Sequence, residues 1–138
     1  GTNGGKMSKS ANNIINIFLD DKSLRKQVMS IETDSTPLED PKNPDTCNAF
    51  AIYSLLANEK QIAAMKANYL GGNYGYGHAK QALFELITET FKTEREKYNY
   101  YINNLPEVDE LLKIGAQKAA TVANGVLGRV REKLGFEG

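Results

Sequence analysis

The segment that decides the fold is residues 45–56, which read Asp45-Thr46-Cys47-Asn48-Ala49-Phe50-Ala51-Ile52-Tyr53-Ser54-Leu55-Leu56. Its apolar side chains fall on nearly all sides of a helix rather than on one stripe. Such a helix is stable only where other elements surround it. The side chain of Asp45 can accept a hydrogen bond from a backbone amide of the first turn. We therefore expect a helix capped by Asp45 at the centre of the hydrophobic core.

Helices are also predicted on both sides of this segment. Before it, Asp20 or Asp21 can cap a helix. The apolar side of that helix consists of Leu24, Val28 and Ile31. After it, residues 59–70 form a helix that Gly71 and Gly72 end, because glycine adopts the left-handed C-cap conformation without strain. The apolar side of this second helix consists of Ile62, Met65 and Tyr69.

The C-terminal half predicts two long helices, residues 78–104 and 107–134. The first has an apolar stripe of Ala79, Ala82, Leu83, Leu86, Ile87, Phe91, Tyr98, Tyr101, Ile102 and Leu105. Tyr98 and Tyr101 are therefore expected in the core, with Tyr100 facing water. The second has a stripe of Val108, Leu111, Leu112, Ala119, Val122, Val126, Val130 and Leu134. The short joint before Pro106 predicts that these two helices pack antiparallel, and Gly135 can cap the second.

The chain shows no alternating strand pattern, so the predicted fold is all-α, an antiparallel helical bundle of about five helices. Residues 1–13 are rich in glycine, serine, asparagine and lysine and have almost nothing to bury, which predicts a flexible N-terminal loop. Residues 32–45 contain three of the four prolines and predict an extended linker. Within it, Asp34 can hold a basic side chain from elsewhere or bond its own backbone in a turn. The sequence leaves both roles open.

Composition narrows the class of protein. The chain has 138 residues, 17 basic and 17 acidic side chains and zero formal net charge, which argues against a broadly basic surface that coats nucleic acid. The single cysteine, Cys47, and single histidine, His78, exclude an internal disulfide and make a zinc site unfavourable, so no metal site is predicted. A nucleophilic pair of Cys47 and His78 is formally allowed, but Cys47 lies in an apolar run and is expected to be a buried small hydrophobe. No apolar run has the length of a membrane span, so no membrane partner is expected.

The most specific motif is the lysine loop, Lys6-Met7-Ser8-Lys9-Ser10. Two ammonium groups and two hydroxyls on a pliable backbone suit a triphosphate. The lysines can neutralise charge on a leaving pyrophosphate, while hydroxyls and backbone amides donate hydrogen bonds. The glycine spacing of a Walker loop is absent. Taken without a family, such a segment is more often a solvated linker than a phosphate site.

Two further regions carry side chains that suit RNA. In the glycine- and tyrosine-rich segment 71–80, Tyr74 and Tyr76 can stack on an unpaired base while Lys80 grips it. More often such tyrosines close over a core, and His78 is expected to cap the following helix or to bond the backbone. Basic residues of the last helix can follow RNA phosphates: Lys113, Lys118, Arg129, Arg131 and Lys133. Dipole and solubility roles explain those near its C-terminus equally well.

The lysine loop matches the second signature of class I aminoacyl-tRNA synthetases, and the rest of the chain resembles the bacterial tryptophanyl-tRNA synthetases. The matching stretches are residues 6–10 followed by Asn13, and residues 21–26, 29–39, 44–48, 68–69, 71–72, 75–83 and 130–136. These ordered matches cover nearly the whole chain from Lys6. The resemblance is therefore much more specific than five residues alone.

The resemblance implies a ligase that activates tryptophan with ATP and charges tRNA(Trp) in the cytoplasm. In the family the lysine loop closes on ATP, so Lys6 and Lys9 are the implied catalytic residues. All five loop residues then bind ATP, and Lys9 stabilises the transferring phosphates. The resemblance divides the chain into an ATP-binding loop, residues 1–19, and a helical anticodon-binding domain, residues 20–138. Mg²⁺ is implied to accompany ATP, and the full enzyme is implied to be a homodimer.

Two features depart from the family pattern. Ala11 stands where an aromatic or hydroxyl residue is expected, which removes one contact but leaves the lysines in place. The chain also lacks the nucleotide-binding domain with its His-x-Gly-His motif, tryptophan pocket and most of the dimer surface. It therefore resembles the C-terminal part of the family's members. The alternative is a free-standing helical RNA-binding or scaffold module, with the lysine loop as an incidental tail.

We predict that this chain alone forms no tryptophanyl-adenylate, because the domain that holds tryptophan in the family is absent from it. The measurement is ATP–pyrophosphate exchange with and without tryptophan. Tryptophan-dependent turnover by the isolated chain would contradict the interpretation.

Overall fold

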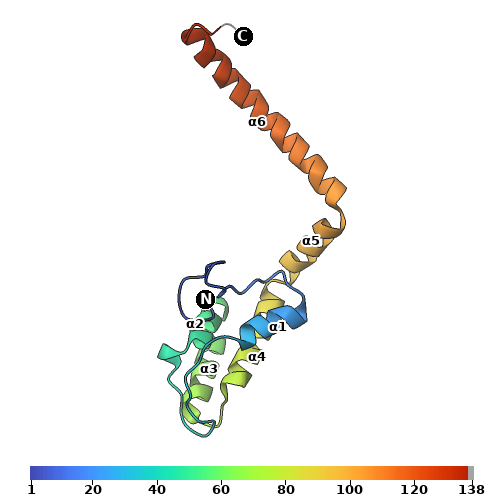
Figure 1. The fold of residues 1–138 in the computed structure, drawn as a ribbon. Helices are drawn as coiled ribbons and strands as arrows, with labels where there is room; N and C mark the ends of the chain where they lie inside the picture. The colour runs from blue at the N-terminus through green and yellow to red at the C-terminus, as the bar shows by residue number, and fades with distance from the viewer. Residues whose placement is uncertain (137–138) are drawn as a thin grey trace. The chain divides into compact units, whose positions relative to one another are not determined.

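The secondary structure of the computed structural model, which describes residues 1–136, is entirely helical (Figure 1). No strand occurs within these residues, so the predicted all-α class is confirmed. The chain divides into two compact units, residues 1–95 and residues 96–138. The first unit holds all of the buried hydrophobic residues that the structure describes.

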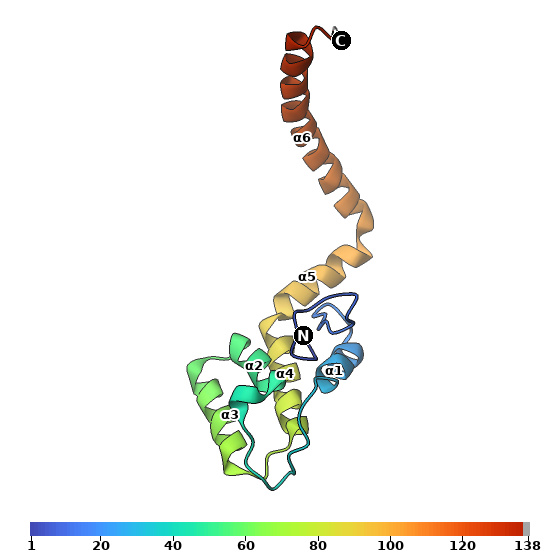
Figure 2. The same ribbon diagram turned by 60° about the vertical axis from the view of Figure 1, so that its left-hand side comes forward.

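The core of the first unit lies around α4 (Tyr76–Thr90), which packs against both α1 (Asp21–Met29) and α2 (Asn48–Leu56). The remaining long helix of this unit, α3 (Glu59–Gly71), lies beside α2 (Figures 1 and 2). The core consists of Leu24, Val28, Ile31, Cys47, Ala49, Phe50, Tyr53, Met65, Tyr69, Ala79, Leu83 and Ile87. Every predicted helix of this unit therefore contributes to one core.

The prediction that α2 is surrounded on all sides is wrong. Ala49, Phe50 and Tyr53 face the core, but Leu55 on the other side is 82% exposed. The physical reason is that the elements packed most closely on α2, namely α3, α4 and the short 3₁₀ turn η1 (Pro44–Thr46), do not cover Leu55. Its second apolar side is left without a neighbouring helix.

Tyr69 joins these elements. Its side chain is fully buried, and its ring lies against those of Phe50, Tyr74 and Tyr76, with centroid separations of 5.6, 5.9 and 6.1 Å. Its hydroxyl lies 3.3 Å from the Cys47 sulfur. Burial raises the pKa of the Tyr69 phenol well above its usual range. Cys47 is 6% exposed, which confirms it as a buried small hydrophobe.

Of the side chains predicted to cap helices in the first unit, Asp20 caps its helix, while Asp45 and His78 do not. Asp20 caps α1, since its carboxylate accepts a hydrogen bond from the Ser23 amide at 3.0 Å. Asp45 does not cap α2, because Pro44 starts the separate turn η1 and Asp45 lies inside it. His78 is not a cap either, since α4 begins at Tyr76, and Gly75 holds the N-cap position without a side-chain hydrogen bond.

The predicted helix 78–104 is two helices. α4 ends at Thr90, Phe91 has the non-helical angles φ −103° and ψ 19°, and α5 (Lys92–Asn103) follows. No side chain of α5 is buried. Tyr98 and Tyr101 are each 40% exposed, so their expected place in the core is wrong. The break at Phe91 interrupts the helical register on which that expectation relied.

The second unit contains the last part of α5 and the whole of α6 (Leu105–Lys133). As predicted, Pro106 lies in the first turn of α6, and Gly135, with φ +73°, follows its end. The expected antiparallel packing of α5 against α6 is not formed. Neither helix has a buried side chain. The joint allows only local contacts, such as the 2.6 Å hydrogen bond from the Tyr100 hydroxyl to Glu107. None of the described helices is both long enough and apolar enough to cross a bilayer.

Gly72 provides a test of the first unit. It has φ +71°, and a Cβ atom there would lie 2.5 Å from the Glu39 carbonyl oxygen. We predict that Gly72→Ala lowers the free energy of unfolding by about 2 kcal/mol or more, because it adds left-handed strain and a backbone clash. The measurement is urea denaturation followed by circular dichroism.

Gly77→Ala is the matched control, because a Cβ atom at position 77 meets nothing within 4 Å and the residue lies in α4. It should be neutral or stabilising, since alanine favours a helix more than glycine does. Equal destabilisation by the two variants would contradict the proposed role of Gly72.

Candidate functional site

The lysine loop has no regular secondary structure, but it has a defined path. The Asn12 amide donates to the Lys9 carbonyl at 3.2 Å, and Asn12 has φ +49°, so the chain turns after Lys9. The hydroxyls of Ser8 and Ser10 lie 2.7 Å apart. The side chains of Lys6 and Lys9 are exposed, and within residues 1–136 no carboxylate lies within ion-pair distance of either ammonium group. Both charges are therefore available to an anion.

Asn13 holds this loop from inside. Its side chain is 2% exposed, although the surrounding residues were expected to bury almost nothing. Its Oδ1 accepts from the Ser8 amide at 2.8 Å, and its Nδ2 donates to the Lys6 carbonyl at 3.0 Å and to Asn3 Oδ1 at 2.7 Å. The irregular segment is thus shaped by one amide side chain.

Met7 lies beside an apolar groove on the first unit. The groove has a volume of about 120 Å³ and is lined by Met7, Ile15, Ile17, Ile52, Leu55, Leu56, Ile87 and Phe91. Met7 is 45% exposed, so part of its side chain lies against this surface. The middle of the lysine loop therefore borders a groove formed with residues of α2 and α4, while the lysines on both sides are exposed.

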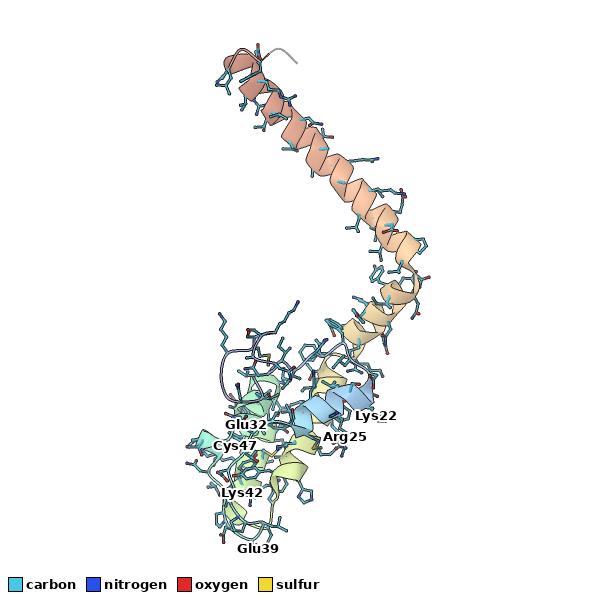
Figure 3. All side chains as sticks on the ribbon, viewed as in Figure 1. Lys22, Arg25, Glu32, Glu39, Lys42 and Cys47 are labelled. Carbon is cyan, nitrogen blue, oxygen red and sulfur yellow. The ribbon has the colours of Figure 1, made fainter. Side chains whose placement is uncertain are left out.

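The linker between α1 and α2 wraps around a buried lysine that the sequence did not reveal (Figure 3). Lys42 is 2% exposed, and its ammonium group donates to the carbonyls of Pro37, Leu38 and Asp40 at 2.7, 3.2 and 3.0 Å. It also lies 5.6 Å from the centre of the Tyr76 ring. A lysine in a proline-rich linker has no periodic signal that predicts burial.

The tyrosines and the lysine of segment 71–80 have partners within the fold. The Tyr74 hydroxyl donates to Met65 sulfur at 3.4 Å, and the Lys80 ammonium group donates to the Met29 carbonyl at 3.2 Å. Burial lowers the pKa of Lys80. The Tyr76 hydroxyl donates to Asp34, as described below, so the three side chains bond three different parts of the first unit: α3, α1 and the linker.

Asp34 adopts the turn-forming role among the two that the sequence left open. Its Oδ1 accepts from the Thr36 amide at 2.9 Å and from the Tyr76 hydroxyl at 2.7 Å. The hydrogen bonds from Thr36, followed by that from Tyr76, hold the pKa of Asp34 below 3.8. Burial, with the bond to Asp34, raises the pKa of Tyr76 to about 12.

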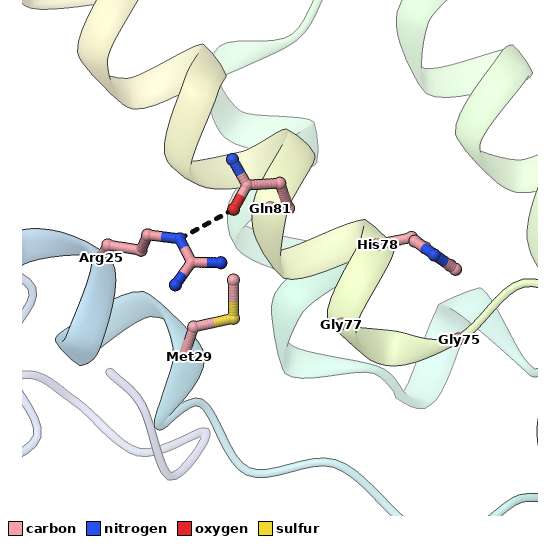
Figure 4. A pocket seen from close by; sticks show the side chains of 6 residues that line it. All are labelled: Arg25, Met29, Gly75, Gly77, His78 and Gln81. Carbon is pink, nitrogen blue, oxygen red and sulfur yellow. Dashed lines mark hydrogen bonds between the residues drawn. The ribbon is translucent and has the colours of Figure 1, made fainter.

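An open cleft lies between α1 and the start of α4 (Figure 4). It is lined by Arg25, Met29, Gly75, Gly77, His78 and Gln81. Arg25 Nε donates to Gln81 Oε1 at 2.9 Å, and the His78 ring points away from Arg25 and lies near the Tyr74 ring. The Cys47 thiol lies against Tyr69 instead, so the nucleophilic pair of Cys47 and His78 is not formed.

The sequence model of the family described as "tRNA synthetases class I (W and Y)" matches residues 1–92. The chain belongs to this synthetase family. The match includes the lysine loop, Asn13 and segment 71–80, so the synthetase family covers the part of the first unit that holds these features. This membership favours the synthetase interpretation over a free-standing RNA-binding or scaffold module.

Relatives of this synthetase chain include the tryptophan–tRNA ligases of Fusobacterium nucleatum, 48% identical over 138 residues, and Campylobacter jejuni, 44% identical over 136 residues. The matches cover 100% and 99% of this chain but 42% and 43% of those ligases. The chain therefore spans about two-fifths of the length of the curated relatives that it matches.

A solved structure supports the same relationship. The crystal structure of tryptophanyl-tRNA synthetase from Campylobacter jejuni, complexed with ADP and tryptophan, has a TM-score of 0.94 and 44% sequence identity. The alignment covers 98% of this chain and 42% of that one. The helical fold of this synthetase chain is thus shared with that structure.

The remaining predicted RNA-binding residues of this synthetase chain lie on α6. Lys113 and Lys118 are exposed, and Lys113 has Glu110 as an ion-pair partner at 3.5 Å. Contact with RNA by these two residues, or by Tyr74, Tyr76 and Lys80, stays a prediction.

The hydrogen bond between Tyr76 and Asp34 provides a test of the structure around segment 71–80 in this synthetase chain. We predict that Tyr76→Phe lowers the free energy of unfolding at pH 7 by about 1 kcal/mol, because it removes one hydrogen bond to a carboxylate. Since the pKa of Asp34 is lowered on folding, this contribution is present above the unfolded value of 3.8 and is lost as the pH falls below it.

The measurement is urea denaturation of both proteins at pH 7 and at pH 3. Tyr53→Phe is the control, because Tyr53 does not contribute to the lowered pKa of Asp34. A Tyr76→Phe difference that is as large at pH 3 as at pH 7 would show that the bond to Asp34 is not its source.

Proposed function

We propose that this chain is the C-terminal part of a tryptophan–tRNA ligase, which activates tryptophan with ATP and transfers it to tRNA(Trp) in the cytoplasm. The observation that carries this proposal is the lysine loop, with two ammonium groups that have no ion-pair partner among residues 1–136, in a chain of the class I synthetase family. Support also comes from the 48% identity, over all 138 residues, to a tryptophan–tRNA ligase.

In this proposal the lysine loop acts on the phosphates of ATP. The tryptophan carboxylate attacks the α-phosphorus, the bond to the bridging oxygen breaks, and pyrophosphate leaves with the additional negative charge. Lys9, with Lys6, stabilises that charge, while Met7 seats the loop and Ser8 and Ser10 offer hydroxyl donors. These interactions are stronger in the transition state than with ATP, so they accelerate the transfer.

Mg²⁺ is proposed to arrive with ATP rather than to occupy a protein site of this chain. Within residues 1–136, no group of three or more histidine, cysteine or acidic side chains is arranged to hold a metal ion. Triphosphate oxygens are suitable ligands for this ion. The lysine loop then supplies the protein's cationic contribution to charge neutralisation.

The helical part is proposed to bind tRNA(Trp). The functional division is residues 1–19 as the ATP loop and residues 20–138 as the anticodon-binding part. Exposed Lys113 and Lys118 are suited to phosphates. Tyr74, Tyr76 and Lys80 are proposed to contribute ring edges and charge from the border of the core. The full enzyme is proposed to be a homodimer.

We predict that Lys9→Ala in the full-length protein lowers the rate of tryptophan-dependent ATP–pyrophosphate exchange by about 100-fold or more, because one donor to the developing charge is lost. Tryptophan binding, measured by calorimetry, should be unchanged. Lys66→Ala is the control, because Lys66 is an exposed lysine on α3. An exchange rate within twofold of the wild-type rate for Lys9→Ala would overturn the proposal.

A further inference from the structure

We infer that Asn13 is a positioning residue, whose buried amide sets the backbone of the lysine loop so that Lys6 and Lys9 act together on one phosphate group. This inference rests on the proposed function of the lysine loop. It assigns a role to a residue that neither carries charge nor reaches the solvent-exposed side of the loop.

Asn13 bonds the backbone of the lysine loop at two points between Lys6 and Lys9. Nδ2 of Asn13 holds the carbonyl of Lys6 at 3.0 Å, and Oδ1 holds the amide of Ser8 at 2.8 Å. These two groups lie on either side of Met7, so one planar amide holds the backbone at the carbonyl of the first lysine and at the residue that precedes the second. The spacing of the two ammonium stems is thus set by a single side chain.

Both polar atoms of the Asn13 side chain have hydrogen-bond partners within the fold. The second Nδ2 hydrogen bond goes to Asn3 Oδ1 at 2.7 Å, and the Asn13 carbonyl accepts from the Thr2 amide at 2.9 Å. A 2%-exposed amide with these partners costs little to bury, whereas a substitute would leave partly buried backbone groups of the loop without this partner. Solubility and loop propensity explain none of these contacts.

Asn13 also connects the lysine loop to α2 through a series of hydrogen bonds. The Thr2 carbonyl accepts from the Glu32 amide at 2.7 Å, and the Glu32 carbonyl accepts from Asn48 Nδ2 at 3.4 Å. Hydrogen bonds therefore lead from the lysine loop through residues 2 and 32 to the first turn of α2. A loop held in this way has less freedom to lose when it closes on a phosphate.

The test compares Asn13→Asp with Asn12→Asp in the full-length protein. An aspartate in place of Asn13 keeps the shape of the side chain and the acceptor for Ser8, but it replaces both Nδ2 donors by an oxygen that faces two other oxygens. Asn12→Asp adds the same charge one residue away, at an exposed position where aspartate tolerates a positive φ. The two variants therefore differ in the buried hydrogen bonds and not in net charge.

We expect Asn13→Asp to lower kcat/KM for ATP in the exchange reaction by about 10- to 100-fold, and Asn12→Asp to change it by less than about threefold. The KM for tryptophan should not change for either variant. In a Lys9→Ala background, Asn13→Asp should have a smaller effect than in the wild type, because one of the two lysines through which Asn13 acts is then absent. Limited trypsin digestion of the same proteins, analysed by mass spectrometry, should show faster cleavage after Lys6 and Lys9 in Asn13→Asp only.

Equal kinetic effects of the two aspartate variants would overturn the positioning role. So would an Asn13→Asp effect that is as large with Lys9→Ala as without it, because that result indicates general destabilisation. If Lys9→Ala itself leaves the exchange rate unchanged, the proposed function of the loop fails first. If Lys9→Ala abolishes exchange while Asn13→Asp behaves like Asn12→Asp, only the inference about Asn13 fails.

Discussion

The first unit depends on the burial of one tyrosine that must also satisfy its own polar groups. Tyr69 is fully buried, so its hydroxyl needs a partner, which the Cys47 sulfur provides. Its backbone carbonyl accepts from the Lys42 amide at 2.7 Å, which fixes the end of the linker against α3. Its ring contacts aromatic rings from α2 and from the start of α4. The linker, α2 with its N-cap residue Cys47, and the start of α4 thus converge on one residue of α3.

Three cations of the first unit serve the fold in a way that the lysines of the lysine loop do not. Lys42, Lys80 and Arg95 give their donors to backbone carbonyls, of Pro37, Leu38 and Asp40, of Met29 and of Ile17, respectively. These carbonyls lie in the linker, at a helix end and in an irregular segment, where no helix or strand partner is at hand. The ammonium groups of Lys6 and Lys9 have no hydrogen bond to a backbone carbonyl within residues 1–136. Charge that completes the fold and charge that is free for an anion are therefore carried by different residues.

Sequence patterns predicted the helices well, because apolar spacing and glycine positions depend on neighbouring residues alone. Leu24, Val28, Ile87 and the turn at Gly72 are examples. The same patterns failed for Asp45, Tyr98 and Tyr101, whose places depend on a proline-started turn and on the break at Phe91. For the candidate site, composition showed only that the lysine loop suits a triphosphate, and the resemblance to the synthetase signature singled it out. Asn13 and Lys42 were not given these roles, because burial of a polar side chain depends on distant carbonyls and amides that no periodicity reveals.

The place of Cys47 gives the chain an internal reporter. It is the sole thiol in 138 residues, and it lies under Tyr69, between the first turn of α2 and the far end of α3. Cys47 is only 6% exposed, so separation of those two segments greatly increases the access of a thiol reagent to its sulfur. The rate of its modification under native conditions therefore measures how often the interior opens, without any engineered label.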